Sequence, residues 1–450
     1  MGKLKLSEKI GYAMGDVASN FYWRVFDLFL LIFYTDVFGL PAAAVGTMML
    51  VTRIIDAVSD PVMGAIADRT KTRFGKFRPY LLWGILPLAA AGVLTFTVPD
   101  VGTGGKTVWA YATYIFMMLA YTFINVPYGA LIGVVTRDSE DRTALTSFRF
   151  IGAFTGGSLV AYFTPKLVDW FGQGNEAAGW QMAMGLYGLV AAALFVLTFL
   201  STRERVVPVS QERTPVWRDI RDLSDNKPWL ILFSLALVIM MTISLRASTG
   251  TFYFKYYVER PDLIGSFSMT YMLALMAGAA ITPLLTKFMG KKQLLLVLMS
   301  LVSVLSAVFF FVPSDQIVLM YVLQVAIGLC LGPKSPLVFS MYADTADYSE
   351  WKTGRRATAM VFSAAAFSQK LGGALAGALI GWLLGALGYA ANEVQSDASA
   401  MGIILLMTLI PAFFAALSVV LIRFYGLDEA TIEAVNSDLE QRAVKNEFGV

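Results

Sequence analysis

The chain has no histidine and only one cysteine, Cys330, among its 450 residues. A single cysteine excludes an intramolecular disulfide, and its apolar surroundings predict a packing role. The absence of histidine removes the side chain that ordinarily titrates near neutral pH and a common metal ligand. Any proton transfer would therefore fall to carboxylates, and a transition-metal site is not expected.

Charge is also scarce, because only 15% of the residues are charged whereas 57% are hydrophobic and the mean hydropathy is +0.64. Apolar runs of about twenty residues recur along the chain, the first over residues 10–37 and the last over residues 400–425. These runs predict an all-α membrane protein with about twelve transmembrane helices.

Lysine and arginine are concentrated in alternate connections between the predicted spans. Lys3, Lys5 and Lys9 precede the first span and several basic residues between Arg69 and Arg78 follow the second, whereas the intervening loops carry few or none. By the positive-inside rule, both termini are expected in the cytoplasm. The Lys-rich start continues directly into a long span, so we predict no cleavable signal peptide and a place in the bacterial plasma (inner) membrane.

A long polar connection divides the spans into six and six. We predict an N-terminal six-helix bundle at 1–200, a cytoplasmic linker at 201–227, a C-terminal six-helix bundle at 228–426 and a cytoplasmic tail at 427–450. Phe74-Gly75-Lys76 resembles Met289-Gly290-Lys291, and Arg142-Thr143-Ala144 resembles Arg356-Ala357-Thr358, both at an offset of about 215 residues. This repeat indicates duplicated bundles with a substrate site between them near the membrane midplane.

Three ionisable residues lie inside the strongly apolar second span. Arg53, Asp56 and Asp60 are spaced so that they share one helix face. An intramembrane carboxylate is costly unless it is paired or holds a cation, so a lipid-facing orientation is not expected. We interpret the cluster as a buried cation or proton site; the alternative is an Arg–Asp pair that only joins two helices.

Hydroxyl groups near this cluster would complete an oxygen-rich site. Ser59 precedes Asp60, and Thr122 lies in the fourth span, on the same face as Asn125. Either hydroxyl would supply an oxygen to a cation held by Asp56 and Asp60, and an all-oxygen set favours Na⁺. Ordinary hydrogen bonding between membrane helices is the alternative.

The first span carries a polar stripe that includes Asp16, Asn20, Arg24 and Asp27. The amide of Asn20 suits sugar hydroxyls, and the ring of Trp23 suits the face of a sugar. The alternatives are that Asp16 and Arg24 neutralise charges on neighbouring helices and that the aromatic rings pack in the core.

Four basic residues lie within later spans or at their ends: Arg149, Arg246, Lys334 and Lys370. Lys370 is the deepest, and a cation at that depth has to pair with a carboxylate or contact substrate. Arg246 and Lys334 add positive charge that favours an anionic sugar such as a uronide. Pairing with Asp344 or Asp16 across helices is the alternative.

Several strings resemble known transporter motifs. Gly64-Ala-Ile-Ala-Asp68-Arg69 followed by Arg73-Phe-Gly-Lys76 resembles the cytoplasmic loop signature of the major facilitator superfamily. More specifically, four strings resemble the glycoside-pentoside-hexuronide cation symporters, the melibiose-permease-like family: Phe33-Tyr-Thr-Asp36-Val37, Arg53-Ile-Ile-Asp56-Ala-Val-Ser-Asp60-Pro61, Gly75-Lys-Phe-Arg-Pro79 and Ala343-Asp344-Thr-Ala-Asp347-Tyr-Ser-Glu350. The resemblance runs from about Leu6 to Asp428.

The resemblance implies a major facilitator fold with twelve transmembrane helices in two six-helix bundles. It also implies a cation site at Asp56, Ser59, Asp60 and Thr122 and a sugar pocket that uses Asn20, Asn125, Arg149 and Lys370. Asn20 and Asn125 replace two acids of the family pocket, and Gly129 stands where the family pattern has a tryptophan. These departures imply a roomier or differently shaped pocket and favour a hexuronide or another acidic glycoside.

We therefore predict a symporter that couples inward movement of Na⁺ or H⁺ to uptake of a sugar or glycoside by alternating access, with Na⁺ held by Asp56 and Asp60. The predicted substrate-binding residues are Asp16, Asn20, Trp23, Asn125, Arg149, Arg246, Lys334 and Lys370. A lipid or drug transporter of the same superfamily is the alternative, and it would need an apolar pocket. We expect no enzymatic activity, no cofactor beyond the coupling ion, no nucleic-acid partner, a lipid bilayer as surroundings and a monomer.

Overall fold

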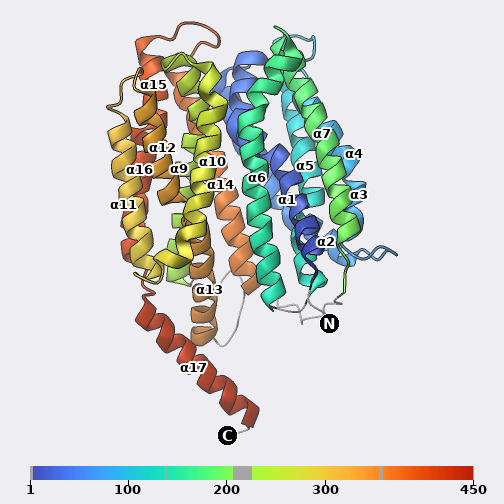
Figure 1. Cartoon of the computed structure of the whole chain (residues 1–450), viewed down its shortest axis with the longest axis vertical. Helices are drawn as coiled ribbons and strands as arrows, with labels where there is room; N and C mark the ends of the chain where they lie inside the picture. Colours follow the sequence, from blue (N-terminus) through green and yellow to red (C-terminus); the bar gives the residue numbers. More distant parts are fainter. Residues whose placement is uncertain (1–3, 137–138, 206–224, 354–357, 449–450) are drawn as a thin grey trace. The chain divides into compact units, whose positions relative to one another are not determined.

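The computed structural model describes residues 4–136, 139–205, 225–353 and 358–448, and this part of the chain folds into helices and connecting loops without a named β-strand (Figure 1). Among the described residues, nine helical segments are long and apolar enough to cross a membrane. Helices α1, α6 and α14, which lie at three further predicted spans, complete the expected twelve. The prediction of an all-α membrane protein is confirmed.

The helices of the first half are α1 (Leu6–Ile32) with the π-helical turn η1 (Phe33–Val37), α2 (Ala42–Arg69), α3 (Arg78–Trp83) with α4 (Ile85–Thr95), α5 (Thr103–Val135), α6 (Ser139–Gly172) and α7 (Glu176–Ser201). Those of the second half are α9 (Lys227–Phe252) with the π-helical turn η2 (Tyr253–Tyr257), the short η3 (Pro261–Leu263) with α10 (Ile264–Leu285), α11 (Lys291–Phe309), α12 (Ile317–Leu331) with α13 (Lys334–Thr353), α14 (Thr358–Ala386), α15 (Asp397–Met407) with α16 (Leu409–Phe424), and α17 (Glu429–Phe448).

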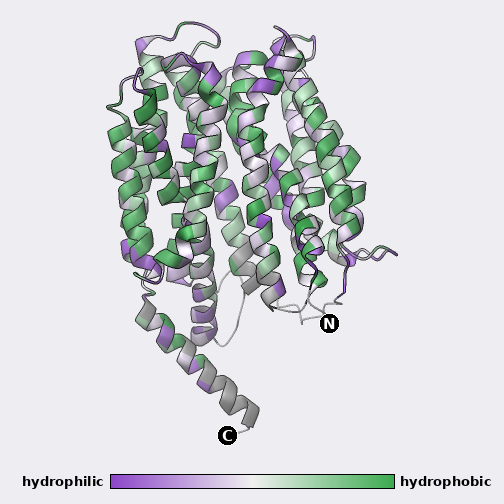
Figure 2. Ribbon diagram, viewed as in Figure 1, coloured by the Kyte–Doolittle hydropathy of each residue, from purple (hydrophilic) through white to green (hydrophobic). Residues whose placement is uncertain are grey.

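Large apolar side chains cover the outside of these helices. Leu86, Val108 and Leu189 are each at least 70% exposed, and Figure 2 shows hydrophobic residues along most of the length of the helices, with many of the hydrophilic ones at their ends. A water-soluble monomer does not expose apolar surface on this scale. Lipid acyl chains are the surroundings in which such a surface is favourable.

The chain forms two compact units. Unit 1 contains residues Met1–Ser210, Ala247–Leu273 and Gly377–Ile403, and unit 2 contains Gln211–Arg246, Ala274–Ala376 and Ile404–Val450. The division into bundles at 1–200 and 228–426 stays a prediction. The predicted linker, 201–227, falls mainly on residues 206–224, which lie outside the described residues.

Unit 2 includes the predicted polar tail, whose residues form α17. Val435 is buried, and the indole of Trp351 on α13 donates a hydrogen bond to the carboxylate of Asp438 at 2.7 Å. The polar tail therefore forms a helix that packs against α13.

A local motif occurs twice in unit 1, at an offset of 220 residues. The amide of Phe38 donates to the carbonyl of Phe33, and the amide of Val258 donates to the carbonyl of Tyr253, so each long helix ends in a π-helical turn. The next residue has a positive φ in both copies, 84° at Gly39 and 58° at Glu259. This structural repeat agrees with the duplication read from the sequence.

The loop after α2 is held by a carboxylate that the sequence did not single out. Glu204 accepts hydrogen bonds from the backbone amides of Lys76, Phe77 and Arg78 at 2.8, 2.7 and 3.0 Å. Gly75, with φ 108°, leaves room for this carboxylate, which a Cβ would approach to 2.5 Å. The negative charge lies at the start of α3, where the helix dipole favours it.

Helix α6 contacts α1 backbone to backbone. A Cβ added at Gly152 would lie 2.7 Å from the carbonyl oxygen of Ala13, and one added at Gly156 would lie 2.9 Å from that of Val17. The small residues of α6 thus set the distance between the two helices, as is usual in membranes. This contact fixes where the polar stripe of α1 points.

The variant Gly152→Val is expected to lower stability by about 1–3 kcal/mol, because the added side chain overpacks the contact between α1 and α6. The matched control is Gly185→Val on α7, where nothing lies within 4 Å of an added Cβ. Thermal unfolding of both purified variants in detergent measures the difference. Equal melting temperatures for the two variants would contradict the packing account.

Candidate functional site

Two carboxylates and one hydroxyl meet between α2 and α5. Thr122 Oγ1 lies 3.0 Å from Asp56 Oδ1 and 3.1 Å from Asp60 Oδ1. Asp56 is fully buried, Thr122 is 3% exposed and Asp60 is half-buried. The structure therefore brings together three of the four residues predicted to hold a cation, inside protein and not against lipid.

A threonine hydroxyl carries one proton, so Thr122 donates to only one of the two carboxylates at a time. Two ionised carboxylates this close repel each other, so positive charge near these oxygens is favourable. The three oxygens are ligands of the kind that a hard cation prefers.

Ser59, the fourth predicted cation ligand, donates its hydroxyl hydrogen bond to the backbone carbonyl of Asp56 at 3.0 Å. Its side chain thus bonds to its own helix. Pro61 follows Asp60 inside α2 and lacks an amide hydrogen, so the helical hydrogen bonding is interrupted next to the carboxylates.

Arg53 connects the carboxylates to an aromatic side chain of α1. Its Nη1 atom lies 3.6 Å from Asp56 Oδ2, and its guanidinium group stands 4.3 Å from the centre of the Trp23 ring. The Arg–Asp contact lies within α2, so it does not join two helices, and Asp56 Oδ1 faces Thr122. Trp23, a predicted substrate residue, is thereby only one side chain away from the cation site.

A second polar cluster lies on α1, α5 and α6. Arg149 Nε lies 2.5 Å from Asp16 Oδ2, and its Nη2 atom lies 3.3 Å from Asp16 Oδ1. The phenol of Tyr128 donates to the same carboxylate at 2.9 Å, and the centre of its ring lies 4.9 Å from Cζ of the Arg149 guanidinium group. The structure thus brings two predicted substrate residues together as an ion pair. Asp16 has Arg149 as its cationic partner.

The predicted amide residues lie close to this pair along α1 and α5. Asn20 is half-buried and donates to the backbone carbonyl of Asp16 at 2.9 Å, and Asn125 is half-buried on α5. Next to them, Gly129 has nothing within 4 Å of an added Cβ. Open space at this position is what the replacement of a family tryptophan by glycine led us to expect.

Unit 2 contains the remaining three predicted residues. Arg246 is fully buried, donates to the carbonyl of Met407 at 2.9 Å and to Gln324 Oε1 at 2.5 Å, and stacks near Phe309. Lys334 is 2% exposed and donates to Gln369 Oε1 at 3.0 Å. Lys370 is half-buried on α14.

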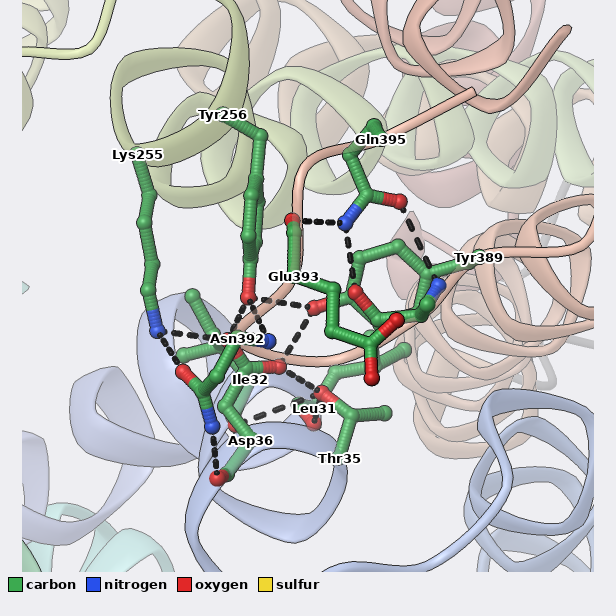
Figure 3. A network of polar contacts seen from close by, with 11 residues as sticks. Leu31, Ile32, Thr35, Asp36, Lys255, Tyr256, Tyr389, Asn392, Glu393 and Gln395 are labelled. Carbon is green, nitrogen blue, oxygen red and sulfur yellow. Dashed lines mark hydrogen bonds and ion pairs between the residues drawn. The ribbon is translucent and has the colours of Figure 1, made fainter.

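A network centred on Asp36 of η1, which continues α1 at the end opposite the N-terminus, was not predicted from the sequence (Figure 3). Lys255 Nζ lies 2.6 Å from Asp36 Oδ2, and the phenols of Tyr256 and Tyr389 both donate to this carboxylate. Asn392 donates to the backbone carbonyl of Asp36 at 2.6 Å and accepts from Lys255 at 2.8 Å. The network joins η1, η2 and the loop between α14 and α15 within unit 1.

Burial and the Asp36 carboxylate raise the pKa of the Tyr389 phenol. The phenol consequently remains a neutral donor at physiological pH, which keeps the network intact. One signal in the sequence pointed to it: Asp36 interrupts an apolar run, and Tyr256 stands 220 residues later, at the equivalent place in the second copy of the motif.

Comparisons with known proteins agree with this arrangement. A family model described as MFS/sugar transport protein matches residues 11–429. The chain is 36% identical over 449 residues to the putative glycoside/cation symporter YagG of Escherichia coli (strain K12), covering 99% of this chain and 98% of the relative. It is 34% identical over 440 residues to the isoprimeverose transporter of Lactiplantibacillus pentosus, covering 97% and 91% of the two chains.

Among solved structures, that of the nucleoside transporter NupG matches with a TM-score of 0.63 at 13% identity, covering 94% of this chain and 100% of that one. At this identity the likeness concerns the fold alone, and it is the fold of a major facilitator transporter. The chain belongs to the MFS/sugar transport family. Within it, the chain is of the glycoside-pentoside-hexuronide type, as its motifs indicated.

Removal of one partner from the Asp16–Arg149 pair is expected to destabilise the protein. Asp16→Asn should cost about 1.5–3 kcal/mol, since it leaves a largely buried guanidinium group without its carboxylate. The double variant Asp16→Asn/Arg149→Gln should recover part of this loss, because no uncompensated charge remains. Thermal unfolding of the four proteins gives the double-mutant cycle; additive losses would show that the pair contributes nothing.

Proposed function

We propose that the protein couples inward movement of Na⁺ to uptake of a glycoside, with the cation held by Asp56, Asp60 and Thr122. One observation carries the proposal: a single hydroxyl lies 3.0 and 3.1 Å from two carboxylates, which brings three oxygens together inside an apolar helix bundle. The ligands are all oxygens, which suits Na⁺ and also allows H⁺. The cation is cargo that enters and leaves in each cycle.

The substrate proposal rests on the polar cluster beside Asn20, Asn125 and Gly129. Amide donors and acceptors, an aromatic ring at Trp23 and the guanidinium of Arg149 are groups that bind sugar hydroxyls and rings. The name of one relative mentions glycosides with a cation and that of the other mentions isoprimeverose, which supports a glycoside here. Asn20 and Asn125 stand where the family pattern has acids, which supports an acidic glycoside such as a hexuronide.

Coupling follows from the short path between the two sites. Trp23 stacks on Arg53, and Arg53 contacts the carboxylate of Asp56. A cation at Asp56 and Asp60 weakens the hold of Asp56 on Arg53, which frees the side chains that face the sugar. If the cation tightens sugar binding, the sugar tightens cation binding by the same factor. The proposed direction is inward, as in the symporter family that the motifs resemble.

The cation site is tested by Thr122→Val, which keeps the side-chain shape and removes the hydroxyl. The Na⁺ concentration for half-maximal uptake should rise about 10- to 100-fold, the range for a hydrogen bond to a charged group. Thr122→Ser, which keeps the hydroxyl, is the matched control and should stay within a few-fold of the unchanged protein. The same Na⁺ dependence in all three proteins would overturn the assignment.

Asp56→Asn and Asp60→Asn should each abolish accumulation against a gradient in reconstituted vesicles, because the coupling ion loses a charged ligand. The vesicles are loaded by an imposed Na⁺ gradient at equal pH, and separately by a pH gradient without Na⁺, with isoprimeverose and methyl β-glucuronide as substrates. Accumulation driven only by the pH gradient would show that the coupling ion is H⁺ and not Na⁺. Accumulation by either Asn variant would contradict the site.

A further inference from the structure

Unit 1 contains a cavity of about 560 Å³ at the end of α1 that carries the Asp36 network. Residues of α1 and η1, α6, α7, α9 with η2, and η3 with α10 line it. Its volume lies within the range of about 300–1,000 Å³ that is usual for small-molecule sites. It is separate from the cluster at Asp56, which lies further along the bundle on α2 and α5.

The lining combines aromatic rings with charges of both signs. Phe29, Phe33 and Trp180 provide the aromatic part of the wall, and Lys166, Asp169 and Glu176 provide exposed charges. The carboxylates of Asp169 and Glu176 are exposed, and Glu176 is close enough to Lys255 for their charges to interact. The wall therefore offers both acceptors and a cationic donor to a ligand.

We propose that this cavity is an outer binding site for the transported glycoside, occupied before the sugar reaches the cluster around Arg149. The inference rests on the proposed function. Aromatic carbon next to carboxylate acceptors and ammonium donors matches a molecule with an apolar ring face and many hydroxyl groups. The positive-inside rule predicts both termini in the cytoplasm, so this end of the bundle is expected to face the outside, where the substrate arrives.

The cavity shares part of its wall with the Asp36 network. Asp36 and Lys255 both line it, and they are held together at 2.6 Å. A sugar hydroxyl in the cavity competes with Asp36 for the ammonium group of Lys255. Occupation therefore weakens the contact that joins η1 to η2, and access of the sugar from outside is coupled to opening at this end.

The test uses labelling of single cysteines in a Cys330→Ser background. Lys166→Cys places a thiol in the cavity wall, and Trp170→Cys, one turn further along α6, places a thiol at a position that is 68% exposed and does not line the cavity. Right-side-out vesicles are treated with a membrane-impermeant maleimide, with and without isoprimeverose or methyl β-glucuronide. The compound that the unchanged protein accumulates should slow labelling at position 166 about tenfold and leave position 170 unchanged.

The same labelling is repeated with Arg149→Ala, which disables the inner cluster. Protection at position 166 should persist, because the outer site does not use Arg149. Loss of protection in this variant, equal protection at both cysteines, or no reaction at position 166 from outside would overturn the outer site. If neither compound is accumulated, the proposed function fails and this inference fails with it; accumulation without protection overturns the outer site alone.

Discussion

The structure depends on one constraint: two carboxylates are placed in the interior of an apolar helix bundle, where each needs a positive partner. An uncompensated buried charge costs several kcal/mol, more than most single packing contacts contribute. Thr122 Oγ1 lies 3.0 and 3.1 Å from carboxylate oxygens of Asp56 and Asp60, and the guanidinium group of Arg53 lies 3.6 Å from Asp56 Oδ2. A cation bound among these oxygens would add positive charge where the two carboxylates converge, and its exchange would change which contacts are favourable.

Coupling between the ion and the sugar needs no long pathway in this protein. Asp16, Asn20 and Trp23 lie on α1, and the position of α1 is set by its close contact with the glycines of α6. Trp23 reaches Arg53, which reaches Asp56, so one guanidinium group contacts both the aromatic wall and the cation site. The same helix ends at Asp36, where charged and phenolic groups from η2 and the loop after α14 meet. A displacement of α1 would therefore change the contacts at the Asp16 cluster, at the cation site and at Asp36.

The features that depend on local sequence pattern were predicted well. Apolar runs predicted the spans, and the spacing of Asp56 and Asp60 predicted a shared face that the structure confirms. The features that depend on distant contacts were predicted poorly. Asp36 and Tyr389 are 353 residues apart, and Glu204 reaches its amide donors across 126–128 residues, so no periodicity could join them. Arg246 shows the same limit: its depth was evident, but its carbonyl partner at Met407 becomes visible only when α9 and α15 are placed together.

The central claim is that the oxygens of Asp56, Asp60 and Thr122 hold Na⁺, and equilibrium binding of Na⁺ to the purified protein measures this most directly. The protein is titrated with NaCl, with choline chloride as the control, while the heat of binding is recorded. The account predicts saturable binding of Na⁺ by the unchanged protein and none by Asp56→Asn, because the cation loses a charged ligand in this variant. Equal binding of Na⁺ by the unchanged protein and by the variant, or no binding by the unchanged protein, would contradict the account.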